Sequence, residues 1–376
     1  MANEIENPFV TVGYAGEKYF CDRKKETEGI VKRLRNGNNL ALISPRRMGK
    51  SGLILHCFDN REIRENFYTF YVDIYATLTL DEFVVAMGKE IVGKLKSKGE
   101  KALERFAKTV ASLSPGISFD TLGNSTLTLL PGEVRNSDVT IDEIFRYLEE
   151  ADRPCIVAID EFQQITEYPQ KNTEALLRTH IQKCRNSRFI FAGSRRHTMG
   201  EIFLSGARPF YQSVSMMSLG SIDRQTYFDF AEKHFADGGK KLPKDVFEGI
   251  YDRYDGVTWY IQKMLNTIYM DTCKGEIVSP GMVNRARKEI IDGFSYVYLD
   301  TLYRLTVKQK EVLIAIARAG KATGITSTKF IKDYALSGAS SVQSASKWLL
   351  RNDFITTEGD CWYVYDYFFA EWLRTL

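Results

Sequence analysis

The sequence lacks long hydrophobic runs, a secretion signal and any large excess of charge. None of its apolar stretches approaches the ~18 residues of a membrane-spanning helix. The first residues, Met1 to Glu6, are acidic and lack the basic and then apolar pattern of a signal peptide. A net charge of +3 over 376 residues is too small to indicate nucleic-acid binding by itself. We therefore expect a protein without a membrane segment.

Closely spaced cysteine pairs are also missing. The six cysteines show no C-x-x-C spacing, and Cys155 lies within an apolar run, which is typical of a buried free thiol in a reducing compartment. We therefore expect a cytoplasmic location. Hydrophobic residues make up 44% of the chain and charged residues 26%, as in ordinary globular proteins, and the length leaves room for two or three domains.

The most informative motif is a near-complete phosphate-binding loop. An apolar strand pattern at 39–43 precedes it, and an apolar helix pattern at 52–58 follows it. In such a loop backbone N–H groups converge on phosphate at a helix N-terminus, a lysine reaches the outer phosphates, and a hydroxyl binds Mg²⁺. The residues predicted to bind the nucleotide are Pro45, Arg46, Arg47, Met48, Gly49, Lys50, Ser51 and Gly52.

One position departs from the usual loop. Ser44 stands where the first glycine is expected. Pro45 follows it and favours an extended conformation at Ser44. We therefore expect that the loop does not need a positive φ at Ser44.

An acidic pair at the end of an apolar run completes the predicted site. The run from Cys155 to Ile159 reads as a strand buried on both faces, and Asp160 falls at its carboxyl end, where open α/β sheets bind ligands. We expect Asp160 and Ser51 to hold Mg²⁺, and Glu161 to activate the water that attacks the γ-phosphate. A purely structural role is hard to assign to two carboxylates at the end of a buried strand.

A third apolar run, Arg188 to Gly193, ends in Ser194, Arg195 and Arg196. If this strand neighbours the one ending at Asp160, these side chains lie at the same sheet edge. Arg195 is our candidate for sensing the γ-phosphate or stabilising charge on it. The alternative, a solvated arginine pair after a strand, is equally compatible with the sequence.

These motifs together resemble the STAND class of P-loop NTPases, in particular an ATPase family described mainly from archaea and also found in bacteria. The resemblance implies ATP binding, slow regulated hydrolysis and a C-terminal winged-helix domain. It covers most of the chain and is carried by residues 45–51, Ile-Asp-Glu-Phe-Gln at 159–163, Gly-Ser-Arg-Arg-His at 193–197, the segment 19–26 and Gly256 to Gln262.

The order of patterns predicts an α/β P-loop core with a doubly wound parallel sheet, followed by an all-α lid domain and a winged-helix domain. Predicted helices at 22–35 and 81–98 alternate with strands, and a small hairpin insertion is expected near 112–137. From Leu219 only helical spacing appears. We place the domains at 1–218, 219–300 and 301–376.

The last segment has the helix, helix, helix and hairpin order of a winged helix. Its third helix, 340–352, carries small polar residues suited to a DNA groove, namely Ser341, Gln343, Ser344, Ser346 and Lys347. Basic residues outnumber acidic ones by ten to seven from Arg304 to Leu376. Glu358 and Asp360 at the hairpin tip would repel phosphate. DNA binding and protein docking, including self-association, therefore both stay open.

The sequence thus predicts a Mg²⁺-dependent ATPase that acts as a regulated switch between ATP and ADP. The rival interpretation is a DNA-associated regulator that binds nucleotide without significant turnover. Phosphate release that depends on Glu161 separates the two.

Overall fold

The computed structural model describes residues 5–91, 94, 117–119, 125–127 and 137–376. The chain divides into two compact units. The sheet unit contains Val10–Tyr227 and Val257–Trp259, and the helical unit contains the residues up to Phe9, Phe228–Gly256 and Tyr260–Leu376. Each unit has its own core, and each is described by itself below.

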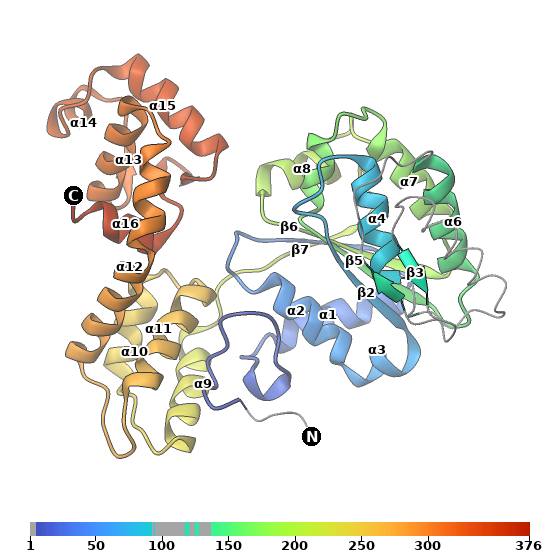
Figure 1. Cartoon of the computed structure of the whole chain (residues 1–376), viewed down its shortest axis with the longest axis horizontal. Coiled ribbons are helices and arrows are strands. Elements are labelled where there is room, and N and C mark those ends of the chain that lie inside the picture. Colours follow the sequence, from blue (N-terminus) through green and yellow to red (C-terminus); the bar gives the residue numbers. More distant parts are fainter. Residues whose placement is uncertain (1–4, 92–93, 95–116, 120–124, 128–136) are drawn as a thin grey trace. The chain divides into compact units, whose positions relative to one another are not determined.

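The sheet unit is built on five parallel strands in the order β2-β5-β6-β1-β7 (Figure 1). Because the strands are parallel, their carboxyl ends meet at one sheet edge. The strand that ends in the acidic pair, β5, is buried at every position, as its apolar run predicts. The strands are β1 (Leu40–Ile43), β2 (Tyr68–Asp73), β5 (Cys155–Asp160), β6 (Ser187–Gly193) and β7 (Ser215–Ser218).

Helices cover both faces of this sheet (Figure 1). Ile156 and Ala158 of β5 pack in one core with α1 (Lys24–Arg35), α2 (Lys50–Asp59) and α3 (Arg61–Asn66). Val157 and Ile159 point to the other core, with α4 (Leu80–Ile91), α6 (Ser137–Glu149), α7 (Thr173–Lys183) and α8 (Arg196–Leu204). The alternation of β5 side chains between two apolar layers confirms the predicted doubly wound parallel sheet.

Two helix boundaries differ from the sequence prediction. The helix expected from Asp22 begins at Lys24, because Asp22 and Arg23 have positive φ angles of 54° and 62°. The helix expected at 81–98 begins at Leu80 and is described as far as Ile91. Most of its predicted remainder lies outside the described residues.

The predicted hairpin insertion is described only in part. Strands β3 (Ile117–Phe119) and β4 (Ser125–Leu127) pair antiparallel as a separate two-stranded sheet. Within the predicted range the segments 112–116, 120–124 and 128–136 lie outside the described residues. Two short 3-10 helices, Glu17–Tyr19 (η1) and Phe162–Glu167 (η2), complete the sheet unit.

The helical unit begins with four helices, of which α9 and α11 start within residues of the sheet unit. They are α9 (Arg224–Asp237), α10 (Lys244–Arg253), α11 (Thr258–Asp271) and α12 (Pro280–Tyr303). The winged-helix order follows, with α13 (Val307–Ala319), β8 (Ala322–Thr323), α14 (Thr328–Asp333), α15 (Ala339–Arg351), β9 (Ile355–Glu358), β10 (Cys361–Val364) and α16 (Tyr367–Leu373). The strands form a sheet in the order β8-β10-β9.

Polar and aromatic contacts join the first four helices to the winged helix. Arg253 and Arg287 pair with Glu371 of α16 at 3.3 and 3.6 Å. Asp255 accepts hydrogen bonds from Lys321 at 2.9 Å and from Tyr367 at 2.7 Å. These contacts lie within one unit, and the division into three domains at 218/219 and 300/301 stays a prediction. In the part of the chain that the structure describes, none of the helices has the length and apolar character of a membrane span.

Candidate functional site

The loop between β1 and α2 contains two residues in the left-handed backbone region. Positive φ angles fall on Arg47 at 69° and on Gly49 at 90°, whereas Ser44 has none. Ser44 is fully buried, and its backbone N–H donates to the carbonyl oxygen of Gly193 at 3.3 Å. Helix α2 begins at Lys50, so its first N–H groups have no acceptor within the helix. The loop therefore presents an anion-binding helix N-terminus with serine in the first glycine position.

Lys50 lies inside this loop with only 6% of its surface exposed. Its Nζ donates to the carbonyl oxygen of Ser44 at 3.4 Å. The pKa of Lys50 is lowered, chiefly by burial, although the neighbouring carboxylates of Asp160 and Glu161 partly oppose this effect. A buried cation held by one long hydrogen bond can gain from contact with an anion.

Ser51 and Asp160 meet although 109 positions separate them. The Ser51 hydroxyl donates to Oδ2 of Asp160 at 2.7 Å, and the Tyr71 hydroxyl donates to the same oxygen. Burial, together with the charge of Asp160, raises the pKa of Tyr71, which keeps its hydroxyl protonated and able to donate. The sequence did not single out Tyr71, because its contact depends on the pairing of β2 with β5.

The chemistry of this donor pair fits Mg²⁺. The cation prefers oxygen ligands and is usually held by one or two protein groups together with phosphate oxygens and water. Ser51 and Asp160 supply a hydroxyl and a carboxylate in direct contact. Among the described residues no group of three or more His, Cys, Asp or Glu side chains forms a self-contained metal site. A Mg²⁺ ion held by Ser51 and Asp160 would leave coordination positions for phosphate oxygens and water.

Glu161 follows Asp160 in a strained turn with a φ of 56°. Its Oε2 accepts a hydrogen bond from the Ser194 hydroxyl at 2.7 Å and one from Nε2 of Gln163. Ser194 follows β6, which neighbours β5, so the predicted convergence of the two strand ends on one site is observed. Gln163 belongs to the motif at 159–163, but its contact with Glu161 was not predicted from the sequence.

Arg195, the candidate for sensing the γ-phosphate, forms an ion pair outside the group around Asp160. Its guanidinium pairs with Glu167 of η2 at 3.1 Å, and about a third of the side chain is exposed. Arg46 lies over the ring of Tyr75 at 5.5 Å from its centroid. Thus Lys50, Ser51, Asp160 and Glu161 gather at the sheet edge, and Arg195 lies beside them in an ion pair of its own.

The start of α11 contacts the phosphate-binding loop within the sheet unit. The backbone N–H of Trp259 donates to the Arg47 carbonyl at 3.0 Å, and the Thr258 hydroxyl donates to the Met48 carbonyl at 3.4 Å. The Arg47 guanidinium lies over the Trp259 ring at 4.4 Å from its centroid. Trp259 is therefore more than a core aromatic, which is how helical spacing alone would interpret it.

Arg23 also contacts the same loop. It is buried, and its Nη2 donates to the carbonyl oxygens of Gly220 at 2.7 Å and Met48 at 3.4 Å. The Met48 carbonyl is thus contacted by side chains from two distant segments. These contacts hold the backbone of the loop at Met48.

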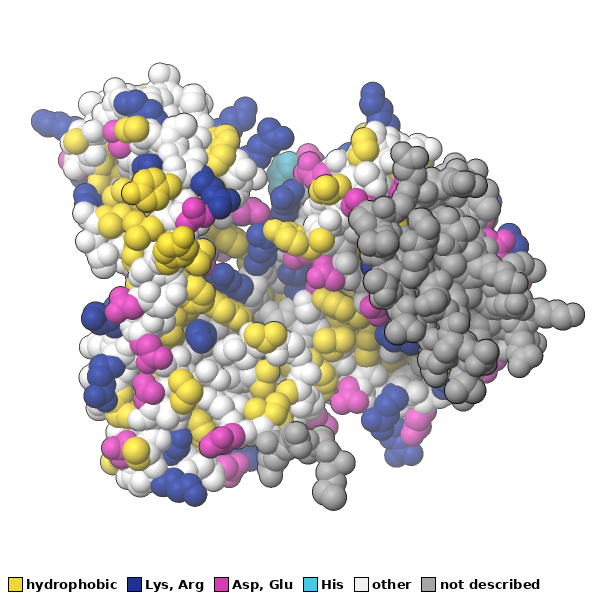
Figure 2. All heavy atoms as spheres, viewed as in Figure 1, with side chains coloured by type: hydrophobic (Ala, Val, Ile, Leu, Met, Phe, Trp, Pro, Cys, Tyr) yellow, Lys and Arg dark blue, Asp and Glu magenta, His cyan; other side chains and the backbone are white. Residues whose placement is uncertain are grey.

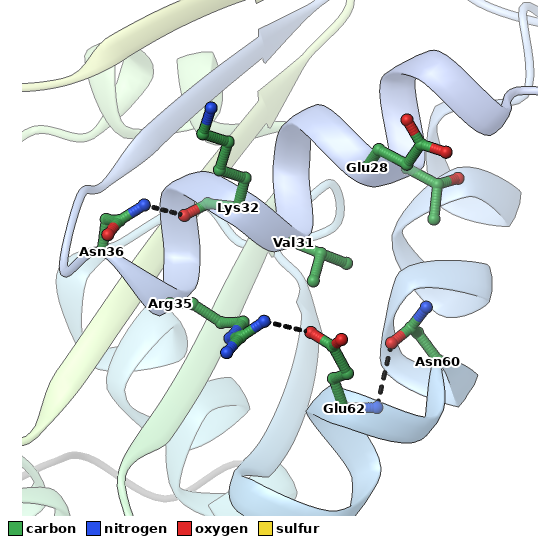
Figure 3. Close-up of a pocket in the computed structure, with 8 residues that line it drawn as sticks. Glu28, Val31, Lys32, Arg35, Asn36, Asn60 and Glu62 are labelled. Carbon is green, nitrogen blue, oxygen red and sulfur yellow. Dashed lines mark hydrogen bonds and ion pairs between the residues drawn. The ribbon is translucent and has the colours of Figure 1, made fainter.

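A separate hollow of about 580 Å³ lies beside α1 (Figure 3). Figure 3 shows the Arg35–Glu62 ion pair and the Asn60 cap within it. Asn60 follows the carboxyl end of α2, whereas Lys50 begins this ten-residue helix, so the length of α2, roughly 15 Å, separates the hollow from the predicted phosphate site. Its lining residues are Thr27, Glu28, Val31, Lys32, Arg35, Asn36, Asn60 and Glu62.

Gly193 marks a close approach that gives a stability prediction. A Cβ at this position would lie 2.5 Å from Oε1 of Gln163 and 2.5 Å from Sδ of Met199. We expect Gly193→Ala to lower the free energy of unfolding by about 1–3 kcal/mol, as overpacking does. Gly200 of α8 has no atom within 4 Å of its added Cβ, so Gly200→Ala should stabilise the chain by roughly 0.5–1 kcal/mol. Chemical denaturation of both variants measures the contrast; equal stabilities would contradict the close packing.

Comparisons with known proteins agree with this geometry. Residues 20–264 match the model of an ATPase domain found predominantly in Archaea, and residues 296–375 match that of a probable winged helix domain. A search of the curated proteins found no match.

Solved structures show the same fold over the whole chain. The Walker-type ATPase paby2304 of Pyrococcus abyssi is 18% identical with a TM-score of 0.63, and the alignment covers 98% of this chain and 99% of that one. The ORC2 protein of Aeropyrum pernix in ADPNP–ADP complexes is 14% identical with a TM-score of 0.59, covering 98% and 96% of the two chains. The ORC1 protein of Aeropyrum pernix in complex with DNA is 13% identical with a TM-score of 0.54 and the same coverage.

Proposed function

We propose that this chain, which belongs to the family of ATPase domains found predominantly in Archaea, is a Mg²⁺-dependent ATPase that acts as a regulated nucleotide switch. The observation that carries the proposal is the direct contact of Ser51 with Asp160, with buried Lys50 and the carboxylate of Glu161 beside it.

Each side chain has a role that follows from its place. The loop from Pro45 to Gly52 and the start of α2 bind the phosphates through backbone N–H groups, and Lys50 contacts the outer ones. Ser51 and Asp160 hold Mg²⁺, which when bound neutralises charge on the phosphate oxygens. Glu161 accepts a proton from the attacking water through its carboxylate.

Arg195 senses the γ-phosphate in this proposal. Its ion pair with Glu167 is partly exposed on both sides, with side-chain exposures of 35% and 55%. Such pairs are typically worth only about 0–1 kcal/mol. Arg195 can therefore leave Glu167 at a small cost in free energy. A bound phosphate would offer its guanidinium a charge-assisted bond in return.

The switch role is supported by the contacts of Thr258 and Trp259 with the loop. Both residues bond to loop carbonyls, and Arg47 stacks on the indole ring. A nucleotide that changes the loop backbone at Arg47 or Met48 changes the acceptors available to the start of α11. Membership of the STAND class, slow turnover and a cytoplasmic location remain parts of this proposal.

Phosphate release tests the enzyme proposal against its rival. The purified full chain should release phosphate from ATP when Mg²⁺ is present and should release none when the metal is chelated. ATP binding without any phosphate release would favour the rival, a nucleotide-binding regulator that associates with DNA.

The exposed side chains of the winged helix support that rival, the regulator that associates with DNA. Helix α15 exposes Ser340, Gln343, Ser344, Lys347 and Arg351, the small polar and basic side chains that a DNA groove accommodates. Ser346, which the sequence also suggested for a groove, is buried, and its hydroxyl donates to the Gln343 carbonyl. Glu358 and Asp360 are also exposed, at the tip of the β9–β10 hairpin, where they would repel phosphate. On the face shown in Figure 2, the Lys and Arg side chains of this part are scattered and do not form one patch. We therefore propose DNA binding as a second activity and test it separately.

If α15 enters a DNA groove, binding must depend on salt. The plot of log affinity against log salt concentration has a negative slope. Neutralising Lys347 and Arg351 together should make this slope less negative by about 2. The control neutralises Arg304 and Lys308, two exposed basic residues at the junction of α12 and α13, and should leave the slope unchanged. Fluorescence anisotropy with duplex DNA, with and without ATP, measures both. Absence of duplex binding at low salt would favour protein docking instead.

Exposed apolar side chains on α12 support a contact with another protein or with a second copy of this chain. Tyr296, Leu299 and Tyr303 share one helix face and are 83%, 45% and 79% exposed. Exposed aromatic side chains at helical spacing are typical of protein interfaces. The proposal therefore includes a protein partner or a second copy of the chain as an alternative to DNA.

A further inference from the structure

We infer that Gln163 is a positioning residue: it orients the Glu161 carboxylate to accept a proton from the water that attacks the γ-phosphate. This inference rests on the proposed ATPase function. Gln163 Nε2 donates to Oε2 of Glu161 and lies 3.5 Å from the Ser194 hydroxyl oxygen, which itself donates to Oε2 at 2.7 Å. Two donors from different elements thus act on one carboxylate oxygen.

The orientation of the Gln163 amide is determined by its neighbour. An ionised carboxylate only accepts hydrogen bonds, so the NH₂ group and not the carbonyl oxygen of Gln163 must face Glu161. The amide oxygen then points toward Gly193, where the absence of a side chain leaves it room. Within the described residues this Oε1 is buried without a hydrogen-bond partner.

That arrangement is unfavourable for a residue with a packing role alone. Gln163 is only 3% exposed, and leaving a polar atom buried and unpaired costs about 1–3 kcal/mol. An apolar side chain of the same size would avoid this cost in the same space. The gain that offsets it lies on the other side of the amide, at Glu161.

The backbone supports the same assignment. Glu161 adopts a left-handed φ of 56°, which starts η2 and turns Gln163 back beneath the carboxylate. The Thr166 hydroxyl donates to the Gln163 carbonyl at 2.8 Å and holds this turn. Among the described residues, hydrogen bonds reach only Oε2 of the Glu161 carboxylate, and Oε1 remains for the proton of the attacking water.

The test replaces Gln163 with methionine, which keeps the side-chain length and removes both the donor and the unpaired oxygen. We expect Gln163→Met to lower kcat by at least about tenfold, because the orientation of the base is lost. ATP affinity measured by calorimetry should stay unchanged, and the unfolding temperature should not fall. The matched control is Gln164→Met, since the Gln164 side chain donates to the Thr77 carbonyl at 3.1 Å and makes no hydrogen bond to the Glu161 side chain. The backbone N–H of Gln164 donates to the Glu161 carbonyl at 2.9 Å, and the substitution preserves that bond.

A double variant separates positioning from a structural role. If Gln163 acts only through Glu161, Gln163→Met should cause no further loss of single-turnover rate in a Glu161→Gln background. An equal loss in both backgrounds, or wild-type kcat in Gln163→Met, would overturn the inference. Should Glu161→Gln itself keep wild-type turnover, the proposed role of Glu161 fails, and the role of Gln163 fails with it. Loss in Glu161→Gln with none in Gln163→Met refutes only the latter.

Discussion

Lys50→Ala should weaken ATP binding by at least ~100-fold, or ~3 kcal/mol, because it removes a buried cation from the phosphate-binding loop. The Nζ of Lys50 has one long hydrogen bond to the Ser44 carbonyl, and burial lowers its pKa. Charge-assisted bonds to phosphate would replace this weak contact, and alanine cannot form them. Isothermal titration calorimetry with ATP and Mg²⁺ measures the loss.

The control for this variant is Lys25→Ala, which removes an exposed lysine from α1. It should bind ATP as the wild type does, and both variants should unfold cooperatively. Unchanged ATP affinity in a folded Lys50→Ala protein would refute the assignment of the loop. Because burial disfavours the charged lysine, loss of the side chain should not itself unfold the nucleotide-free protein.

The sequence predicted the central strands β1, β5 and β6 because they are buried on both faces over most of their length. The edge strand β7 is partly exposed throughout and was not predicted. Continuous apolar runs such as 155–159 have no other simple placement in a chain of alternating strands and helices. Ser51, Asp160 and Glu161 could be placed together for the same reason, since the carboxyl ends of parallel strands and the loops after them share one sheet edge. The expectation that Ser44 needs no positive φ also follows from one local effect, the proline after it.

Contacts between side chains distant in sequence could not be predicted in this way. Tyr71 reaches Asp160 across 89 positions, and its hydroxyl belongs to the site only because β2 pairs with β5. Thr258 reaches the Met48 carbonyl across 210 positions. No spacing rule connects such pairs, because strand order and helix packing determine them.

Gln163 and Arg195 show a further limit. Both lie within a few residues of a predicted strand end, so their neighbourhood was predictable, but their partners were not. Gln163 turns back to Glu161 because of the left-handed turn, and Arg195 turns toward Glu167 of η2. The backbone conformation of one or two residues determines which polar group such a side chain contacts. The hydrophobic periodicity of the sequence does not predict that conformation.

The adjacent carboxylates of Asp160 and Glu161 should fail in different ways when each is neutralised. Asp160 accepts hydrogen bonds from Ser51 and Tyr71 and lies at the proposed metal-binding position. The Glu161 carboxylate accepts hydrogen bonds from Gln163 and Ser194 and, among the described residues, from no other side chain. Asp160→Asn should therefore lose the Mg²⁺-dependent part of ATP affinity. Glu161→Gln should keep ATP affinity and lower kcat by about 10²–10⁴-fold, the usual contribution of a general base.

Titration calorimetry with and without Mg²⁺, together with phosphate release, measures both effects. Glu201→Gln serves as the control, since it neutralises an exposed carboxylate of α8 and should change neither quantity. The geometry makes the distinction sharp, because the backbone N–H of Glu161 donates to Oδ1 of Asp160 at 2.9 Å and both substitutions preserve that N–H. Any difference between the variants then reports side-chain charge and proton transfer. Equal losses of ATP affinity would mean that the two carboxylates bind nucleotide as one group, and the assignment of Glu161 to the attacking water would be wrong.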